Sequence, residues 1–453
     1  MKIDRILLIL SIGMAKFVLI GSGLAGGLLA AYLGRRGYEV DLYERRGDPR
    51  EGSMLEGRSI NLALSTRGIH ALQQIGIADE VLKHAIPMRG RMIHEKSGAL
   101  HFAPYDVDPN KHINSIGRAA LNTTVIKAAQ RYENVRVHFN HKCTSVDLDA
   151  ATAQLLNDST SQQLNASGDA IIGVDGAFST VRQSMQLKID NFQYDESYLA
   201  HGYKELTMPP GPNGAWQMEK NALHIWPRKS FMMIALPNPD GSFTCTLFWE
   251  FEGPRSFAST KTDGDVRRFF EDEFPDAVPL IPNLLEDFKN NPTGSLVTIR
   301  CAPWVYQDKV ALVGDAAHAV VPFYGQGMNA AFEDCVVLDQ CLAAFPRDRE
   351  RAFAEYFQRR KVNADALADL ALGNFIEMRD KTASKTFRAK KKLDHFLEAA
   401  LPGIYLPLYT MVTFTRIPYA RAAHRARLQD RIVYGSLAFF GVIAALVIIR
   451  LIS

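Results

Sequence analysis

Residues 16–26 read KFVLIGSGLAG, the most informative stretch of the chain for its fold. A short apolar run predicts a strand, the glycines Gly21, Gly23 and Gly26 follow it, and residues 24–36 have a helical pattern. In such a unit one glycine makes the tight turn, one lets a pyrophosphate approach the backbone, and one lets the helix pack on the strand. The phosphates then lie at the positive end of the helix. The stretch therefore predicts a Rossmann-type dinucleotide site.

An acidic residue stands at the end of the next predicted strand. Residues 38–43 read YEVDLY after a helix stop at Gly37, and Glu44 follows them directly. An acid at this spacing accepts hydrogen bonds from both hydroxyls of a ribose. The alternative is a glycine-rich strand-helix turn that packs closely and binds nothing, and a second motif argues against it.

The second motif lies nearly 290 residues downstream. Residues 309–313, KVALV, predict another buried strand, which ends in Gly314 and Asp315, and residues 325–329, GQGMN, open a long helical pattern. An aspartate at this place is suited to bond the ribityl hydroxyls of FAD, although it also suits a helix cap or a turn. Together the two motifs predict one tightly bound FAD.

The bulk composition is that of an ordinary globular protein. The chain has 453 residues, and 52 basic against 49 acidic residues give a net charge of +3, so nothing indicates a nucleic-acid partner. We expect a small-molecule ligand. The five cysteines are scattered and lack metal-ligand spacing, which predicts reduced thiols and no metal site.

Both ends of the chain carry apolar segments. Residues 1–13 resemble a short signal peptide, but the first strand follows too soon for a cleavage region, so we interpret them as a dispensable extension before Met14. Residues 432–449 are uncharged and mostly apolar, and as a helix they would span ~27 Å. This predicts a single-pass membrane anchor, and the arginines before it place the large domain in the cytoplasm. A buried core helix is the alternative.

The pattern along the chain predicts an α/β protein in which a Rossmann-type FAD-binding domain is interrupted by an antiparallel-sheet substrate domain. Strands are predicted at residues 222–226, 231–236 and 243–248, with turns between them. The predicted boundaries are residues 1–14 for the N-terminal extension, 15–185 and 296–375 for the FAD-binding domain, 186–295 for the substrate domain, 376–430 for a C-terminal helical region and 432–452 for a transmembrane helix.

The residues leave the chemistry to the cofactor. Only one dinucleotide fingerprint is found, so a nicotinamide nucleotide has to dock transiently. No Ser/His/Asp arrangement, metal constellation or CxxC pair is present in the sequence. We therefore expect that a flavin carries the reaction and that no side chain is a dedicated catalytic acid or base.

The chain resembles the single-component flavin-dependent aromatic hydroxylases. The resemblance covers about residues 15–420 and rests on GSGLAG at 21–26, ERR at 44–46, GRSINLAL at 57–64, Asp175-Gly176 and GDAAHAVVPFYGQGMN at 314–329. Other segments resemble the members that hydroxylate L-kynurenine: MRGRM at 88–92, HGYKEL at 201–206, NALHIWP at 221–227, GNFIEM at 373–378 and YTMVTF at 409–414.

This resemblance implies a flavoprotein monooxygenase. Its FAD is reduced by NADPH, reacts with O2 to a flavin hydroperoxide and converts L-kynurenine to 3-hydroxy-L-kynurenine, a step of tryptophan catabolism and NAD biosynthesis. The implied substrate contacts are Arg91, Tyr105, Asn374 and Tyr409 for the carboxylate and Phe248, Phe323 and Met378 for the ring, with Pro322 and Gln326 nearby. The implied flavin contacts are Gly21, Gly23, Leu24, Ala25, Gly26, Glu44, Arg45, Arg58, Leu62, Arg118, Asp175, Asp315, Gly325, Gly327, Met328 and Asn329.

Two features depart from the family pattern, and two other functions stay open. Tyr324 stands where bacterial members commonly carry histidine, and Gly117 precedes Arg118 where another side chain is common. One alternative function is a membrane-associated FAD-dependent reductase of a prenyl chain, against which the polar segments around Arg91 argue. The other is a non-catalytic prenyl-protein chaperone of the same fold, against which Asp315 argues.

Overall fold

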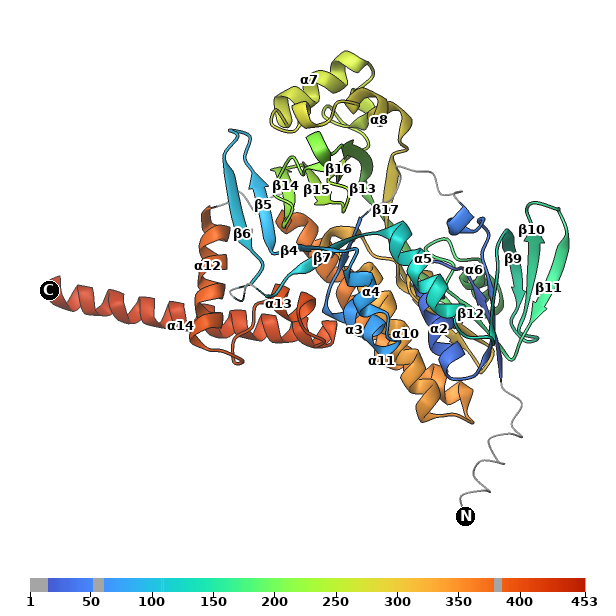
Figure 1. Ribbon diagram of the computed structural model, residues 1–453. Coiled ribbons are helices and arrows are strands. Elements are labelled where there is room, and N and C mark those ends of the chain that lie inside the picture. Colours follow the sequence, from blue (N-terminus) through green and yellow to red (C-terminus); the bar gives the residue numbers. More distant parts are fainter. Residues whose placement is uncertain (1–14, 52–60, 107, 109, 379–384, 453) are drawn as a thin grey trace.

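The computed structural model describes residues 15–51, 61–106, 108, 110–378 and 385–452. The predicted N-terminal extension and the predicted flavin contact Arg58 lie outside the described residues. Figure 1 shows one body that carries helices α7 and α8 above it and a long C-terminal helix that extends from its side.

A six-stranded sheet forms the centre of the FAD-binding part, in the order β18-β19-β12-β1-β2-β8. Strand β1 pairs in parallel with β2 on one side and with β12 on the other. Its four apolar residues are buried, as expected for a strand that is covered on both faces. The strands are β1 (Lys16–Ile20), β2 (Glu39–Tyr43), β8 (Val135–His138), β12 (Ala170–Gly173), β18 (Val305–Tyr306) and β19 (Val310–Leu312).

Helices and a small sheet cover this centre. Helix α2 begins at Leu24, as predicted, and packs between α5 and α10. The helices of this part are α2 (Leu24–Arg35), α3 (Thr66–Gln74), α4 (Ala78–Leu82), α5 (Arg118–Ala129), α6 (Thr180–Lys188), α9 (Asp315–His318) and α10 (Gly327–Ala344). Two three-stranded sheets add β3 (Asn61–Leu64), β4 (Ile86–Met88) and β7 (Ile113–Gly117), and β9 (His141–Asp147), β10 (Thr152–Asn157) and β11 (Gln163–Ser167).

A seven-stranded sheet forms the second part, in the order β17-β13-β16-β15-β14-β5-β6. The strands predicted around residues 222–248 are present as a meander. Strands β5 and β6 join the same sheet from outside the predicted 186–295 range, and β5 pairs in parallel with β14. The strands are β5 (Gly90–His94), β6 (Leu100–Pro104), β13 (Gln193–Met208), β14 (Ala222–Arg228), β15 (Phe231–Pro237), β16 (Phe243–Glu250) and β17 (Gly294–Ala302).

The two faces of this sheet bury different clusters. Alternate residues of a strand point to opposite faces, so Leu247 and Trp249 of β16 pack under α7 (Asp263–Glu273) and α8 (Leu284–Asn290). Phe248, between them, packs on the other face against the FAD-binding part. The inner face of the sheet therefore meets the segment around Phe323. Short 3₁₀ turns complete the chain at Pro49–Glu51, Pro212–Gly214, Phe257–Ser259, Val278–Leu280 and Pro322–Tyr324.

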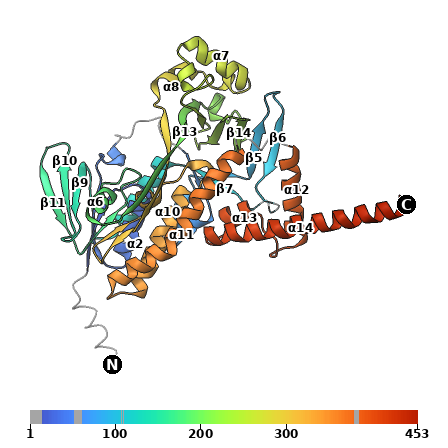
Figure 2. The same ribbon diagram turned by 180° about the vertical axis from the view of Figure 1, so that it is seen from behind.

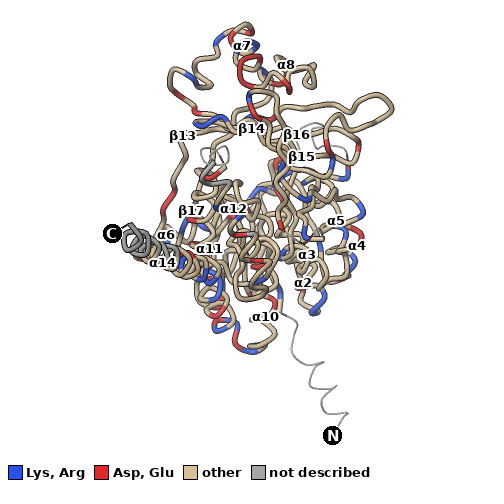
Figure 3. Tube along the Cα trace, turned by 90° about the vertical axis from the view of Figure 1, so that its left-hand side faces the viewer, with Lys and Arg blue, Asp and Glu red and all other residues tan. Residues whose placement is uncertain are grey.

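The C-terminal region is helical. Helix α11 (Arg349–Ile376) lies alongside α10 and reaches α14, and Figure 2 shows it crossing the back of the molecule. The other helices are α12 (Lys385–Ala400), α13 (Leu408–Thr413) and α14 (Tyr419–Ile452). Figure 3 shows basic and acidic residues interspersed over the described chain, in keeping with its nearly balanced charge.

The prediction of a C-terminal transmembrane helix is wrong. Residues 432–452 are not a separate element but the second part of α14, whose first part carries arginines and packs against α11 and α13. Of the helices in the described ranges, none is both long enough and apolar enough to cross a membrane.

Candidate functional site

The glycine turn between β1 and α2 forms a close-packed cradle. Gly21 has φ +104°, and a Cβ there would lie 2.6 Å from the carbonyl oxygen of Val174. A Cβ on Gly26 would overlap the carbonyl oxygen of Gly21, whereas a Cβ on Gly23 would meet nothing within 4 Å. Gly23 is exposed at the N-cap of α2, next to half-buried Leu24. The turn therefore leaves its open side at the positive helix end, which fits a pyrophosphate.

Glu44 lies beside this turn at the end of β2. Its Oε2 accepts a hydrogen bond of 2.8 Å from the backbone N–H of Ser22, and its Oε1 accepts one of 3.0 Å from that of Arg46. The carboxylate is thus fixed next to the cradle, where an adenosine ribose would lie. The side chain of Arg45 is exposed to solvent.

A second loop approaches the first turn of α2. Gly314, with φ +64°, follows β19 at the N-cap of α9, and a Cβ on it would lie 3.6 Å from Cβ of Ala25. Asp315 follows as the first residue of α9, and its side chain is exposed. The two glycine motifs, far apart in the sequence, therefore meet in the structure. The carboxylate of Asp315 is placed to accept hydrogen bonds from a bound flavin.

Buried Asp334 holds this loop, a role that the sequence did not reveal. Its Oδ2 accepts hydrogen bonds from the backbone N–H of Gly314 at 3.0 Å and from Nε2 of His318 at 2.6 Å. Its Oδ1 accepts one of 2.6 Å from Nε of Arg360. Burial opposes ionisation, but His318 and Arg360 outweigh it and hold the pKa of Asp334 below its usual value. A buried aspartate in an apolar helix was the available signal.

The segment at residues 325–329 forms the third loop. Gly325 has φ +64° and approaches Ala63 of β3, and α10 begins at Gly327. The amide of Asn329 donates to the carbonyl oxygens of Ala63 at 2.8 Å and of Gly325 at 2.9 Å, and it accepts from the backbone N–H of Ser65 at 2.9 Å. The side chain of Asn329 therefore ties α10 to β3. Met328 and Leu62 are half-buried on the two elements that it joins.

Two further predicted flavin contacts differ in their surroundings. Arg118 is the first residue of α5, exposed at the end of β7 beside β3. Asp175 accepts hydrogen bonds from the Ser179 hydroxyl at 2.6 Å and from the backbone N–H of Thr180 at 2.7 Å. Burial raises the pKa of Asp175. The Asp175 carboxylate therefore caps α6 in this structure, and only Arg118 has its charged group exposed toward solvent.

The polar half of the predicted substrate site is brought together. The Arg91 guanidinium lies 5.3 Å from the ring centre of Tyr409 and 5.8 Å from that of Tyr105, and these rings stack at 5.2 Å. The Nε of Arg91 and the hydroxyl of Tyr105 are buried without a hydrogen-bond partner in the described chain. Burial raises the pKa of Tyr105 well above its usual value, so the hydroxyl stays protonated. Both groups are donors, as a carboxylate requires.

The apolar half adjoins it. Phe248 of the seven-stranded sheet lies 4.9 Å, between ring centres, from Phe323 of the FAD-binding part. The Asn374 amide donates to the carbonyl oxygen of Phe323 at 2.6 Å and lies 3.4 Å from the sulfur of Met378. The side chain of Asn374 is therefore engaged with protein, while Phe248, Phe323 and Met378 form an aromatic and apolar wall. Pro322 is exposed at the start of the same 3₁₀ turn.

Tyr324 and Gln326 connect these groups. The Tyr324 ring stacks on Tyr409 at 5.7 Å, so the residue that departs from the bacterial pattern packs next to the polar half. The buried Gln326 amide donates to the Ser65 hydroxyl at 3.1 Å and accepts from the Tyr419 hydroxyl at 3.0 Å. In this structure the side-chain amide of Gln326 is thus held by protein groups.

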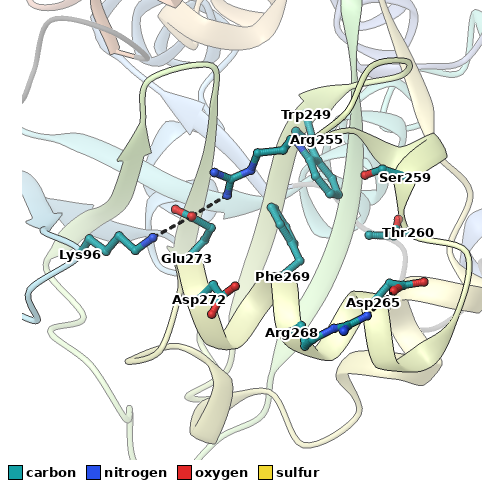
Figure 4. A pocket seen from close by; sticks show the side chains of 10 residues that line it. All are labelled: Lys96, Trp249, Arg255, Ser259, Thr260, Asp265, Arg268, Phe269, Asp272 and Glu273. Carbon is teal, nitrogen blue, oxygen red and sulfur yellow. Dashed lines mark hydrogen bonds and ion pairs between the residues drawn. The ribbon is translucent and has the colours of Figure 1, made fainter.

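A cavity of about 350 Å³ lies away from all these residues, under α7. Figure 4 shows Lys96 and Arg255 directed at Glu273, with hydrogen bonds of 2.8 and 2.5 Å. Trp249 stacks on Phe269 at 3.8 Å beside them. Lys96 and Arg255 pair with Glu273 and are not left unpaired for a ligand. The cavity lies on the outer face of the seven-stranded sheet, apart from the predicted flavin and substrate contacts.

The comparisons with known proteins decide the family. Residues 14–371 match the model of the FAD binding domain. A kynurenine 3-monooxygenase of Myxococcus xanthus is 49% identical over 91% of this chain and 89% of its own length. The chain belongs to the kynurenine 3-monooxygenase family. Its members from Dictyostelium discoideum and Anopheles gambiae are 49% and 43% identical, over 89% and 92% of this chain and 89% and 86% of their own lengths.

Solved structures share the fold of this family member. The tetrameric form of 2-methyl-3-hydroxypyridine-5-carboxylic acid oxygenase matches with a TM-score of 0.66 and 21% identity, covering 88% of this chain and 96% of that one. PqsL of Pseudomonas aeruginosa matches with a TM-score of 0.64 and 20% identity, over 83% and 100%. The FAD-binding α/β fold is thereby confirmed. Membership of the family also decides against a prenyl-chain reductase and a prenyl-protein chaperone.

Proposed function

We propose that this chain is an NADPH-dependent FAD monooxygenase that hydroxylates L-kynurenine to 3-hydroxy-L-kynurenine. Family membership supports the reaction. The structural observation that supports this reaction is a buried pair of hydrogen-bond donors without acceptors, Nε of Arg91 and the Tyr105 hydroxyl. The pair lies next to the aromatic wall of Phe248 and Phe323. An aryl amino acid offers its carboxylate to the donor pair and its ring to the aromatic wall.

FAD fits the three loops described above. The cradle of Gly21 and Gly26 admits a pyrophosphate but no Cβ, and Glu44 and Asp315 offer carboxylates at its two sides. When bound, FAD supplies the redox chemistry, with NADPH as transient hydride donor and O2 as co-substrate. We assign the flavin-facing roles to the backbone of the glycine turns, to Glu44, Asp315 and Arg118.

The protein's own residues place the substrate and exclude water. Arg91 and Tyr105 donate to the carboxylate, and Tyr409 stacks beside them and closes this end. Phe248, Phe323 and Met378 pack the ring. A desolvated arginine binds a carboxylate more strongly than one in water, so the buried donor pair fixes which end of the substrate points away from the flavin loops.

The test is an assay of product. Purified full-length protein with FAD is given NADPH, O2 and L-kynurenine, and NADPH oxidation and 3-hydroxykynurenine are measured together. We expect L-kynurenine to accelerate oxidation and to be converted in proportion. If oxidation rises but only hydrogen peroxide accumulates, L-kynurenine is an effector and the substrate assignment fails. A panel of other aryl amino acids gives the specificity.

A further inference from the structure

A second cavity lies on the far side of α10 from the glycine cradle of α2, between α10, α3, α11 and the loop that precedes α14. Its volume is about 180 Å³. Side chains from all four elements line it, and most of the polar ones are basic. The ones that matter here are Arg67, His70, Glu333, Arg359, Arg360 and Arg416.

The positive charge of this cavity is only partly balanced. Glu333 is the one acidic residue among its described lining, and it is shared by Arg67 at 3.5 Å and Arg360 at 2.6 Å. Arg359 and Arg416 form no ion pair with a described residue, and Arg359 donates to the neutral amide of Gln340 at 3.0 Å. Arg360 also pairs with Asp334 at 2.6 Å, so two carboxylates partly balance the four guanidinium groups of the lining.

One hydrogen-bond donor of a lining residue also has no partner. Arg67 is fully buried, and its Nε lies without a hydrogen-bond partner in the described chain although its other nitrogens donate to the carbonyl oxygens of Thr415 and Ile417. Burial, followed by the nearby Arg416, lowers the pKa of His70, which agrees with a positive local potential. A buried donor without a partner is costly unless a ligand or water satisfies it.

Size and charge together define the ligand. A volume of 180 Å³ is below the ~300–1,000 Å³ of sites that enclose a drug-sized molecule, so the cavity suits a small group. Guanidinium groups bind tetrahedral oxyanions in bidentate fashion, and a monoanion would compensate only one of the two excess positive charges. We propose that this cavity binds a phosphate-class dianion, either free phosphate or the phosphate monoester of a nucleotide.

Two chains of contacts connect this anion site with the flavin-binding loops. The Arg67 guanidinium lies 4.1 Å from the ring centre of Tyr419, whose hydroxyl donates to Gln326 just before α10. Arg360 donates to Asp334, which also holds the backbone N–H of Gly314. An anion that orders these arginines therefore orders the segments that precede α9 and α10, and we expect it to slow the loss of FAD.

The first experiment measures thermal stability of the holoenzyme during titration with sodium phosphate, against sodium chloride at equal ionic strength. We expect a saturable rise in Tm with phosphate alone, because a ligand that binds only the folded state stabilises it. Arg416→Gln, at an exposed side chain, should need at least tenfold more phosphate for the same rise. Arg359→Gln tests the same site independently should the first variant fold poorly.

Arg421→Gln is the matched control, since Arg421 is an exposed arginine five residues from Arg416 and lies outside the cavity lining. It should respond to phosphate as the unaltered protein does. The proposal is overturned if phosphate and chloride act alike at equal ionic strength, or if both cavity variants keep full phosphate affinity. Neither readout requires turnover, so the result is independent of the proposed reaction.

A second arm separates the two sources of the dianion, and it alone rests on the proposed use of NADPH. Adenosine 2′-phosphate is titrated in place of phosphate, with adenosine as the control. A rise in Tm that Arg416→Gln abolishes identifies the 2′-phosphate of NADPH as the natural occupant. A response to inorganic phosphate without one to adenosine 2′-phosphate identifies free phosphate.

Discussion

At the scale of single residues, the proposed substrate site is defined by hydrogen-bond donors without acceptors. The Nε of Arg91 and the Tyr105 hydroxyl are buried next to the stacked rings of Tyr105 and Tyr409, with no hydrogen-bond partner in the described chain. A protein keeps such groups buried at a cost in stability, which a ligand of opposite character offsets. For the same reason we interpret the stacked rings of Tyr105 and Tyr409 as part of a ligand site and not only as packing in a hydrophobic core.

Replacing Arg91 with leucine should chiefly weaken L-kynurenine binding. Loss of a charge-assisted pair in a desolvated site costs about 2 to 4 kcal/mol of binding free energy. The dissociation constant is measured from the flavin absorbance change on titration with L-kynurenine. Arg89→Leu is the control, because Arg89 is two residues away and exposed. Unchanged affinity in Arg91→Leu would place the carboxylate elsewhere.

Two substitutions in the glycine turn should affect different properties, one the stability of the protein and the other its affinity for FAD. In Gly26→Ala the new methyl group overlaps the carbonyl oxygen of Gly21, so α2 has to move away from β1 and the free energy of unfolding should fall by about 1 to 3 kcal/mol. Gly23→Ala meets no protein atom, so its apoprotein should unfold like the unaltered one while its FAD affinity falls. Urea unfolding and FAD titration separate these effects. A stable Gly26→Ala variant would contradict the close packing.

Motifs predicted which segments the structure brings together better than they predicted how the side chains of these segments bond. The sequence identified the loops around Gly21, Gly314 and Gly325, because glycine spacing reflects backbone geometry directly. It did not predict that Asp175 caps α6, that Asn329 bonds β3, or that the Gln326 amide is held by Ser65 and Tyr419. The partners of Asn329 and Gln326 come from distant segments, and no local spacing encodes them. The partners of Asp175 are four and five residues away, but the same local pattern suits either a cap or a cofactor contact.

At the scale of elements, a buried chain of polar groups joins β5, β14 and the turn after α7. His224 donates from Nε2 to the carbonyl oxygen of Glu219 at 2.8 Å, and its Nδ1 lies 2.8 Å from Nε2 of His94. The Nδ1 of His94 lies 2.6 Å from Asp276. If neutral His224 donates through Nε2, its Nδ1 accepts from His94. This chain fixes the strand that carries Arg91 to its neighbours.

This row of buried polar side chains predicts that the stability of the protein depends on pH. Burial lowers the pKa of His224 to about 4, below the ~6.5 of an unfolded chain. The unfolded state therefore binds more protons between these values, so stability falls as pH drops from about 6.5 to about 4, by roughly 3 kcal/mol at most. Tm measured across this range should decline less steeply in His224→Gln. Exposed His424→Gln should keep the original slope; an equal slope in all three proteins would exclude this origin.

Elements were predicted well where their pattern is local. The bounds of β1 and α2 follow from apolar periodicity and glycine, and the strands at 222–250 follow from alternation and turns. Strand β6 was not predicted because its residues are mostly exposed, and the parallel pairing of β5 with β14 joins segments about 130 residues apart. The transmembrane helix was predicted from the composition of residues 432–449 alone. The sequence did not predict that these residues continue a helix that begins at Tyr419.

At the scale of the whole molecule, the proposed cofactor site is built from three separate segments. The turn at residues 21–26, the loop at 314–315 and the segment at 325–329 meet around the first turns of α2 and α10. The wall formed by Phe248 and Phe323 then connects the FAD-binding part to the seven-stranded sheet. Ligand binding at the junction of the two parts should therefore change the stability of both.

Removing FAD should lower the stability of the entire described fold in one transition. A ligand present at about 1,000 times its dissociation constant adds about 4 kcal/mol to the free energy of unfolding, so the apoprotein should melt several degrees lower. Calorimetry of protein before and after FAD removal, with FAD added back as the control, gives the difference. Two separate transitions, or equal Tm values, would show that the parts are not coupled through the site.

The order of strands in the central sheet also bears on synthesis. Strand β12 ends at Gly173, yet its partner β19 begins at Val310, after the whole seven-stranded sheet has been made. At ~5–20 residues per second, a ribosome needs roughly 7 to 28 seconds for the intervening 140 or so residues. Throughout that interval the nascent chain displays an unpaired parallel edge, which is prone to association with other chains. Production of this protein should therefore depend on chaperones that occupy the edge until translation passes Leu312.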